Sequence, residues 1–354
     1  MMNATTNPVR VGGNQCPRLM SRAVTLTRLA AVGSALAVGI LLSTVVLGAE
    51  PAPSVRVAIL NTTSITPATP GVLGYLVAEL KRLGYVEGRN LTIDFRGAED
   101  KPARLPDLAR ELVSLKPDVI LSTGTMEATV AAMKATATIP IVFVHAVDPV
   151  RTGLVASLAR PGGNVTGVTS LNADLGAKRL ELITEIVPGV RRVAVLVSPV
   201  DPETPSMVGA VQSAARVRRV HLDLLEIQDP ARLGAAVNDA TKAGAGALLV
   251  LGSPPLYLLS PSLVQQTAKH RLPAVSAWRE FAEAGGLASY GTSLREMSQR
   301  AAGLVDRILR GAKPAELPVE QPTKFELIVN PKTAKALGIK IPESILLRAD
   351  EVIR

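Results

Sequence analysis

The sequence predicts an α/β protein built from two doubly wound lobes. From residue 55 onwards, short β-branched runs alternate with longer amphipathic stretches, and this alternation occurs in two successive series. Apolar runs of about five to seven residues separated by helices are typical of parallel strands in such a sheet. Hydrophobic residues make up 47% of the chain and aromatic residues only 3%. The cores must therefore consist of Val, Leu, Ile and Ala, which suits buried parallel strands.

The two series supply most of the predicted elements. In the first, strands are expected at 55–60, 90–95, 118–123 and 139–146, and helices at 70–83, 105–115, 127–137 and 151–159. In the second, strands are expected at 191–198, 220–227, 246–253 and 272–277, and helices at 174–187, 205–219, 230–244, 263–270 and 278–285. Two series of similar length favour two similar lobes over one large sheet.

The last part of the chain decides the predicted topology. A strand at 285–291 and a helix at 294–311 would complete the first lobe, and the segments from 325 onwards would return to the second. The expected lobes are therefore 54–164 plus 287–316, and 165–286 plus 317–354. This predicts three chain crossings, near 161–167, 285–288 and 312–324. Several crossings form a hinge whose lobes can close on a ligand.

Residues 1–49 read as an export signal or an N-terminal anchor. Arg22 and Arg28 precede an uncharged run at 29–49 that ends in small residues, which is typical of a secretory signal. The run is long enough to span a bilayer, so an uncleaved anchor remains an alternative. Cys16 is the sole cysteine and lies before the run, which argues against a lipoprotein and against any disulfide. We expect a periplasmic or otherwise extracytoplasmic protein.

Other classes of protein find little support in the sequence. The formal net charge is +9, but the charge is spread without a basic block or a recognisable nucleic-acid-binding motif, which predicts no nucleic-acid partner. His145, His221 and His270 show no metal-ligand spacing, and no nucleophile elbow or phosphate-binding loop occurs. We therefore expect no enzyme, no cofactor and no metal, and interpret the histidines as structural.

Long segments of the chain resemble a known family. They are LKRLGYVEGRNLTIDFR (80–96), a stretch at 139–168, and another at 317–353. These segments resemble bacterial ABC-transporter substrate-binding proteins, the binding component of tryptophan/tyrosine-type importers. The resemblance implies a type I periplasmic-binding fold with a small molecule in the cleft between the lobes, and a membrane permease as partner. We expect the protein to be a monomer. A ligand-sensing protein of the same fold that docks on a membrane sensor is the alternative.

Polar residues after the strands of the first lobe are the first candidates for ligand contacts, because ligands of open α/β sheets bind beyond the carboxyl ends of strands. Asn61 and Ser64 follow the first strand, although they also suit a solvated turn. The turn Thr123-Gly124-Thr125 joins a strand to a helix, so its N–H groups suit a ligand carboxylate, although Thr125 also suits a helix cap. Asp148 is placed to accept an ammonium group, or to open a turn before Pro149.

The corresponding loops of the second lobe supply the remaining candidates. They are Ser198 with Asp201, Ser253 with Tyr257, and Trp278. Trp278 is the only tryptophan, and its ring suits either stacking on a ligand or half-buried packing. These residues predict a site between two sets of loops, and the resemblance implies an amino acid or a similar molecule as its ligand.

Overall fold

A computed structural model describes residues 54–64, 66–68, 71–146, 148–170 and 172–354. The expected export signal or anchor at 1–49 lies outside them. In this part of the chain, no helix combines the length and the apolar character needed to cross a membrane.

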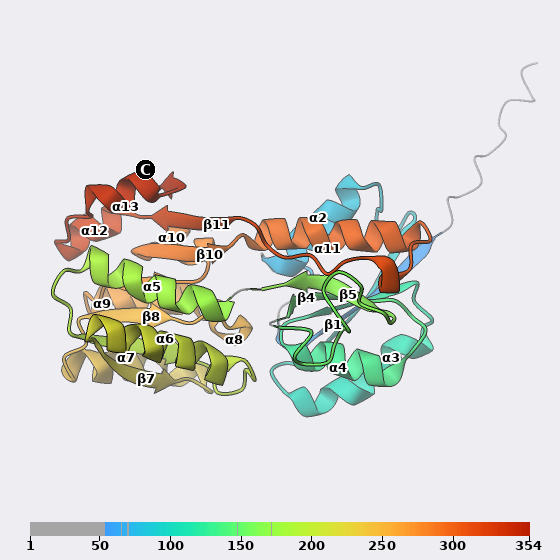
Figure 1. The fold of residues 1–354 in the computed structure, drawn as a ribbon, viewed down its shortest axis with the longest axis horizontal. Coiled ribbons are helices and arrows are strands. Elements are labelled where there is room, and N and C mark those ends of the chain that lie inside the picture. Colours follow the sequence, from blue (N-terminus) through green and yellow to red (C-terminus); the bar gives the residue numbers. More distant parts are fainter. Residues whose placement is uncertain (1–53, 65, 69–70, 147, 171) are drawn as a thin grey trace, which may run out of the picture. The chain divides into compact units, whose positions relative to one another are not determined.

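The first lobe is a parallel sheet of order β2-β1-β3-β4-β5 with helices on both faces (Figure 1). Along β1, Val57 and Ile59 pack into one buried cluster, and Ala58 and Leu60 pack into another on the opposite face. This two-sided burial explains why the strands read as continuous apolar runs. The strands are β1 (Val55–Asn61), β2 (Leu91–Gly97), β3 (Val119–Thr123), β4 (Ile141–Ala146) and β5 (Val165–Thr169). The helices are α2 (Val72–Arg82), α3 (Leu105–Ser114), α4 (Met126–Ala135) and α11 (Leu294–Leu309).

The second lobe is a sheet of order β12-β11-β10-β9-β8-β6-β7, parallel except where β10 meets β11. The strands are β6 (Arg192–Val197), β7 (His221–Glu226), β8 (Ala247–Val250), β9 (Ala274–Ser276), β10 (Ala288–Thr292), β11 (Phe325–Val329) and β12 (Glu351–Val352). The helices are α5 (Asn172–Ile186), α6 (Thr204–Arg218), α7 (Leu233–Lys242), α8 (Pro254–Tyr257), α9 (Ser260–Lys269), α10 (Arg279–Glu283), α12 (Pro331–Leu337) and α13 (Glu343–Arg348).

Helix ends follow from local capping residues. Ser293 caps α11, since its hydroxyl accepts a hydrogen bond from the N–H of Glu296. Asn330 caps α12 in the same way through the N–H of Thr333, and α12 ends at Gly338 in the left-handed conformation. Because Ser293 lies directly between β10 and α11, its cap also marks the point where the chain leaves the second sheet.

Two strands lie in the opposite lobe from the one that the sequence predicted. The strand expected to complete the first sheet is β10, which instead pairs with β9 and runs antiparallel to β11 in the second. Conversely β5, expected in the second lobe, pairs with β4 in the first. A single β-branched run carries no signal for which sheet it joins, because the pairing partner decides this.

The chain passes between the sheets three times within the described residues. The passages lie between β5 and α5, between β10 and α11, and before β11. Glu320 forms an isolated parallel β-bridge with Val168 of the first lobe. The chain therefore leaves the first lobe for the last time after Glu320. The first two passages fall a few residues later than the sequence predicted, and the third falls within the predicted linker.

The helix expected at 151–159 is absent, and irregular turns occupy this segment. Asp148 accepts hydrogen bonds from the N–H of Arg151 and, through its carbonyl, from Thr152. Ser157 then accepts from the N–H of Arg160 and donates to its carbonyl oxygen. Such local side-chain hydrogen bonds compete with helical ones, which explains the wrong prediction.

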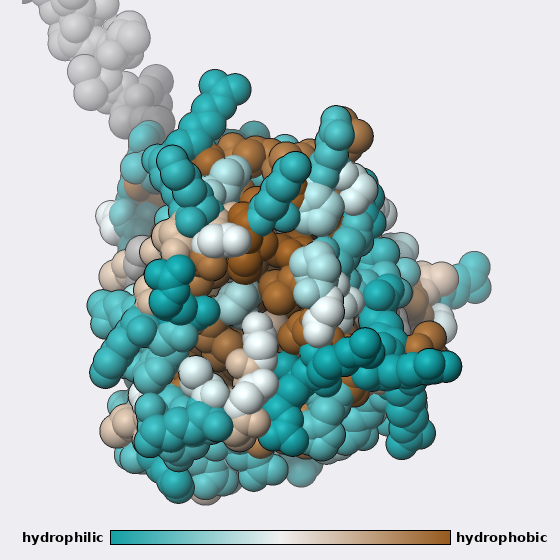
Figure 2. All heavy atoms as spheres, turned by 90° about the vertical axis from the view of Figure 1, so that its left-hand side faces the viewer, coloured by the Kyte–Doolittle hydropathy of each residue, from teal (hydrophilic) through white to brown (hydrophobic). Residues whose placement is uncertain are grey.

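Figure 2 views the end of the second lobe. Its rim is hydrophilic, and apolar side chains gather towards the middle of this face. The exposed large apolar residues of this lobe include Leu346 and Leu347 of α13 and Val352 of β12. This surface lies away from the carboxyl ends of β6 and β8, where the candidate site residues of this lobe are found.

Candidate functional site

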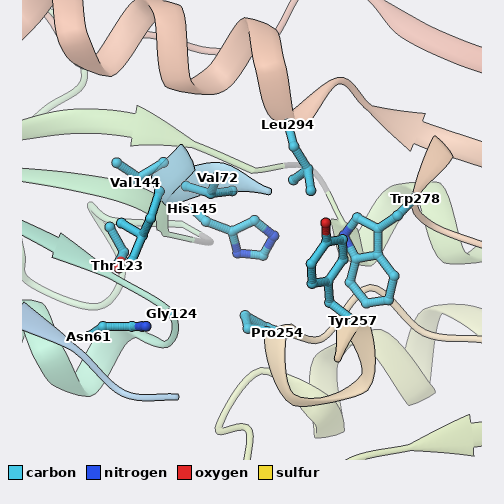
Figure 3. Close-up of a pocket in the computed structure, with 11 residues that line it drawn as sticks. Asn61, Val72, Thr123, Gly124, Val144, His145, Pro254, Tyr257, Trp278 and Leu294 are labelled. Atoms are coloured by element: carbon cyan, nitrogen blue, oxygen red, sulfur yellow. The ribbon is translucent and has the colours of Figure 1, made fainter. Parts of the chain in front are cut away.

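A pocket is lined by residues of both lobes (Figure 3). The first lobe contributes Asn61, Val72, Leu73, Thr123, Gly124, Val144, His145 and Leu294, and the second contributes Pro254, Tyr257 and Trp278. The wall is mainly apolar with a few polar groups, which is typical of a site for a small organic molecule.

The polar part of the first-lobe wall comes from the ends of β1 and β3. These strands pair in register, so that Asn61 lies beside Thr123. The hydroxyl of Thr123 is buried and has no hydrogen-bond partner among the described residues. Gly124 follows with φ of +90°, and a Cβ there would stand 2.1 Å from Thr62 Oγ1 and 2.7 Å from Asn61 Oδ1. Only glycine fits this turn without a clash.

His145 lies between the two walls of the pocket (Figure 3). It has φ of +75°, and the pairing of β4 with β5 shifts register between Val144 and Ala146. Irregularities of this kind are frequent beside binding sites, where they redirect a side chain. Burial, with a smaller contribution from the positive charge of Arg179, lowers the pKa of His145 to about 4. The imidazole is therefore neutral near pH 7, with one N–H donor and one acceptor nitrogen.

An aromatic pair forms the second-lobe wall. The rings of Tyr257 and Trp278 have centroids 5.5 Å apart and planes at 82°, an edge-to-face contact. Tyr257 comes from α8, and Trp278 precedes α10. Burial raises the pKa of the Tyr257 phenol above its ordinary value, with the charge of Glu280 as the next cause. The phenol is therefore neutral and can face an uncharged ring or chain.

The structure places five of the predicted site residues around one pocket. These are Asn61, Thr123, Gly124, Tyr257 and Trp278. Sequence reasoning interpreted His145 as structural and did not select the apolar lining residues Val72, Leu73, Val144, Pro254 and Leu294. The position of His145 near the carboxyl end of a buried strand was the available signal for its place in the wall. The apolar residues carried no signal that separates a pocket wall from a core.

Three predicted residues of the first lobe lie outside this lining. Ser64 is exposed. Thr125 is buried, but its N–H donates to Thr62 Oγ1 at 2.9 Å and its hydroxyl pairs with Glu127. The Thr125 N–H, expected to face a ligand carboxylate, is therefore engaged within the loop. Asp148 has a side chain that is 46% exposed and forms an ion pair with Arg151, at 2.9 Å between Oδ2 and Nε.

Three predicted residues of the second lobe also lie outside the lining, but close to it in the chain. Ser198 follows β6, Asp201 lies in the turn before α6, and Ser253 precedes Pro254 of the pocket wall. All three side chains are buried. Burial raises the pKa of Asp201, and the nearby Ser253 hydroxyl and Glu203 N–H lower it to a smaller extent. Among the described residues, no group of three or more His, Cys, Asp or Glu could hold a metal ion.

Comparison with known proteins identifies the family. The family model described as ABC transporter substrate binding protein matches residues 57–353. The chain is 29% identical over 271 residues to a tyrosine-binding protein from Clostridioides difficile, covering 75% of this chain and 76% of that protein. Most of the described fold is thus shared with this family.

Solved structures agree. A conserved domain protein from Vibrio cholerae superposes with a TM-score of 0.76 at 29% identity, covering 85% of this chain and 100% of that one. An ABC domain from Streptococcus pneumonia in complex with L-Trp gives 0.74 at 25% identity, with the same coverage. The chain therefore has the two-lobed type I periplasmic-binding fold, and it belongs to the ABC transporter substrate-binding family of extracytoplasmic solute-binding proteins.

Proposed function

We propose that this protein captures an amino acid with an aromatic or apolar side chain between its lobes and delivers it to an ABC permease. The pocket wall carries the proposal, because the Tyr257–Trp278 pair and the polar turn at Thr123 and Gly124 line the same pocket. The relatives named for tyrosine and solved with L-Trp support this ligand class. The protein binds its ligand and does not convert it.

The two ends of the pocket suit the two ends of such a ligand. An aromatic side chain would pack against the edge of Trp278 and the face of Tyr257. Its carboxylate would accept hydrogen bonds from the Thr123 hydroxyl and the Gly124 N–H. The Thr125 N–H already donates to Thr62 Oγ1, so the ligand carboxylate would accept hydrogen bonds from fewer groups of this turn than the sequence predicted.

Ligand screening by thermal shift tests the proposal. A ligand at a hundred times its Kd stabilises the folded state by about 2.7 kcal/mol, which is readily detected. We expect L-tyrosine or L-tryptophan to raise the melting temperature more than sugars or nucleobases do. Titration with L-tyrosine should also change the emission of Trp278, the only tryptophan of the chain. Stabilisation by sugars alone would contradict the amino-acid assignment.

A pair of variants at Thr123 tests the carboxylate contact. Thr123→Val keeps the shape and removes the hydroxyl, so affinity should fall about fivefold, the usual net effect of one hydrogen bond. Thr123→Ser keeps the hydroxyl and should bind within about twofold of the parent. Equal affinities for the two variants would show that the hydroxyl does not contact the ligand.

We further propose export by the signal at 1–49. Cell fractionation should find a mature form that starts near Glu50 outside the cytoplasm. Full-length protein in the cytoplasmic fraction would contradict this.

Capture should also bring the lobes together. The three passages between the sheets form a hinge, and small-angle scattering should show a smaller radius of gyration when ligand saturates the protein. An unchanged radius at saturation would mean that ligand does not close the lobes.

A further inference from the structure

A buried polar cluster lies in the second lobe at the carboxyl ends of two paired strands. It consists of Ser198, Asp201 and Ser253, which are 1%, 2% and 0% exposed. Ser198 follows β6 and Ser253 follows β8, and these strands pair in register from Val193 with Ala247 onwards. The cluster therefore sits at the edge of the sheet where open α/β folds bind ligands.

The polar atoms of this cluster are incompletely satisfied. Asp201 Oδ1 accepts a hydrogen bond from the N–H of Glu203 at 3.0 Å. Asp201 Oδ2 and the hydroxyl oxygens of Ser198 and Ser253 have no hydrogen-bond partner among the described residues. The Ser253 hydroxyl lies near enough to the carboxylate to lower its pKa, but no bond within 3.5 Å joins them.

The cluster also lacks a positive charge. None of the ion pairs found among the described residues involves Asp201. A buried carboxylate is costly unless a cationic group or hydrogen-bond donors compensate it. An ammonium group supplies one positive charge and three N–H donors, and the cluster offers three oxygen atoms without partners.

The cluster adjoins the pocket through α8. Ser253 directly precedes Pro254, and both Pro254 and Tyr257 of α8 line the pocket. Asp148, the residue that the sequence selected for an ammonium group, is instead half-exposed and paired with Arg151. Of these two acids, only Asp201 is buried without a cation.

We propose that Asp201, together with Ser198 and Ser253, binds the ammonium group of the ligand. This inference rests on the proposed function and assigns one end of the amino acid. The side chain of the ligand lies against Tyr257 and Trp278. Because Asp201 and Ser253 are almost fully buried, the short helix α8 must shift when the ammonium group reaches them.

Calorimetry with matched ligands tests the assignment. The probes are L-tyrosine and L-tryptophan, each compared with its analogue without the amino group, 3-(4-hydroxyphenyl)propionate and indole-3-propionate. The parent should bind the amino acid about 10- to 100-fold more tightly than its analogue, because charged hydrogen bonds are the stronger ones. Asp201→Asn should remove this preference by weakening the amino acid alone, with the analogue within about threefold.

Asp229→Asn is the matched control. Asp229 also accepts a hydrogen bond from the N–H two residues later, at 2.9 Å from Ala231, but it is exposed in the loop after β7. Its replacement should leave the preference for the amino acid unchanged. Unchanged binding of the analogue by Asp201→Asn shows that this variant is folded. If it does not fold, Ser253→Ala should still reduce the preference about threefold to tenfold.

The outcomes separate the two proposals. If the parent binds neither amino acid, the proposed ligand class is wrong and this inference is wrong with it. If the parent binds amino acid and analogue equally well, the proposed function stands and this inference is wrong. The inference is also wrong if Asp201→Asn weakens both ligands alike, or if Asp148→Asn abolishes the preference instead.

Discussion

The hydroxyl of Tyr257 in the second lobe lies against the backbone of Gly71 in the first. A Cβ added to Gly71 would stand 2.8 Å from Tyr257 Oη, a distance that real Cβ atoms essentially never show. Gly71 directly precedes α2 and has φ of +128°. Glycine at this position therefore permits both the backbone conformation and the close approach of the lobes.

Gly71→Ala should weaken ligand binding, because the methyl group obstructs the contact between the lobes. Calorimetry should show affinity reduced about tenfold or more, whereas unfolding by urea should show a loss of about 1–3 kcal/mol from backbone strain. Gly84→Ala is the control, since Gly84 also has positive φ, +97°, but no neighbour within 4 Å of an added Cβ. Equal affinity losses in the two variants would show that the contact with Tyr257 does not affect closure.

Gly124→Ala should destabilise the fold itself. The added Cβ would meet Thr62 Oγ1, which accepts the hydrogen bond from Thr125, so the loop between β3 and α4 must distort. We expect a loss of about 2–4 kcal/mol in the free energy of unfolding, from strain and a buried N–H without a partner. Gly153→Ala, with φ of +74° and open space around it, should cost only the strain. If Gly124→Ala and Gly153→Ala lose similar amounts of unfolding free energy, the added Cβ at Gly124 does not clash with Thr62.

Thr62 offers a cleaner test of the same loop. Thr62→Val leaves the buried Thr125 N–H without an acceptor and should cost about 1–3 kcal/mol in urea unfolding. Thr62→Ser retains the acceptor and should cost less. A larger loss for the serine variant would mean that methyl packing, and not the hydrogen bond, holds the turn.

Local periodicity predicted most helices and strands, but it could not predict which sheet a strand joins. The run that forms β10 reads like any buried strand, and its antiparallel pairing with β11 depends on residues that follow some 35 positions later. The site shows the same division. Gly124 and Trp278 stand out by residue type, whereas Pro254 and Leu294 line the pocket only because two lobes meet there. His145 stands near the carboxyl end of a buried strand, which is a local signal, but the register shift beside it depends on the pairing of β4 with β5.

Stability should fall on acidification because of His145. Burial lowers its folded-state pKa to about 4 from the ordinary 6.5, so between these values the unfolded chain binds a proton that the folded protein does not. The free energy of unfolding should therefore decrease as pH falls from about 6.5 to about 4, by at most about 3 kcal/mol. Arg179 is the charged group that acts on this imidazole in the same direction.

Urea unfolding between pH 4 and pH 7 measures this slope. His145→Asn removes the titration and suits a position with positive φ, because asparagine tolerates the left-handed region. The variant should lose most of the slope between pH 4 and pH 6.5. Parallel stability profiles for the parent and His145→Asn would contradict the prediction.

A hydrogen bond between the lobes should favour their contact. The Tyr75 hydroxyl of α2 donates to Glu280 Oε1 of α10 at 3.3 Å, and the Arg295 guanidinium lies 4.6 Å from the Tyr75 ring centroid. Burial raises the pKa of Glu280, which means that burial disfavours its charged carboxylate. The hydrogen bond from Tyr75 acts in the opposite direction and stabilises the charged form while the lobes are together. When the lobes separate, water can replace the phenol, and the hydrogen bond therefore stabilises the closed arrangement selectively.

Tyr75→Phe should shift the unliganded protein towards separated lobes and lower the affinity for ligand about five- to thirtyfold. This range corresponds to about 1–2 kcal/mol, which lies where the ranges for neutral and charged hydrogen bonds meet. Phenylalanine keeps the ring on which Arg295 packs, so the loss of affinity measures the contribution of the hydroxyl alone.

Tyr85→Phe is the control, because the Tyr85 hydroxyl donates to Asp306 within the first lobe, at 2.9 Å. It should lower the stability of that lobe without changing ligand affinity or the radius of gyration from scattering. If Tyr75→Phe binds ligand as tightly as Tyr85→Phe does, the hydrogen bond to Glu280 does not contribute to closure.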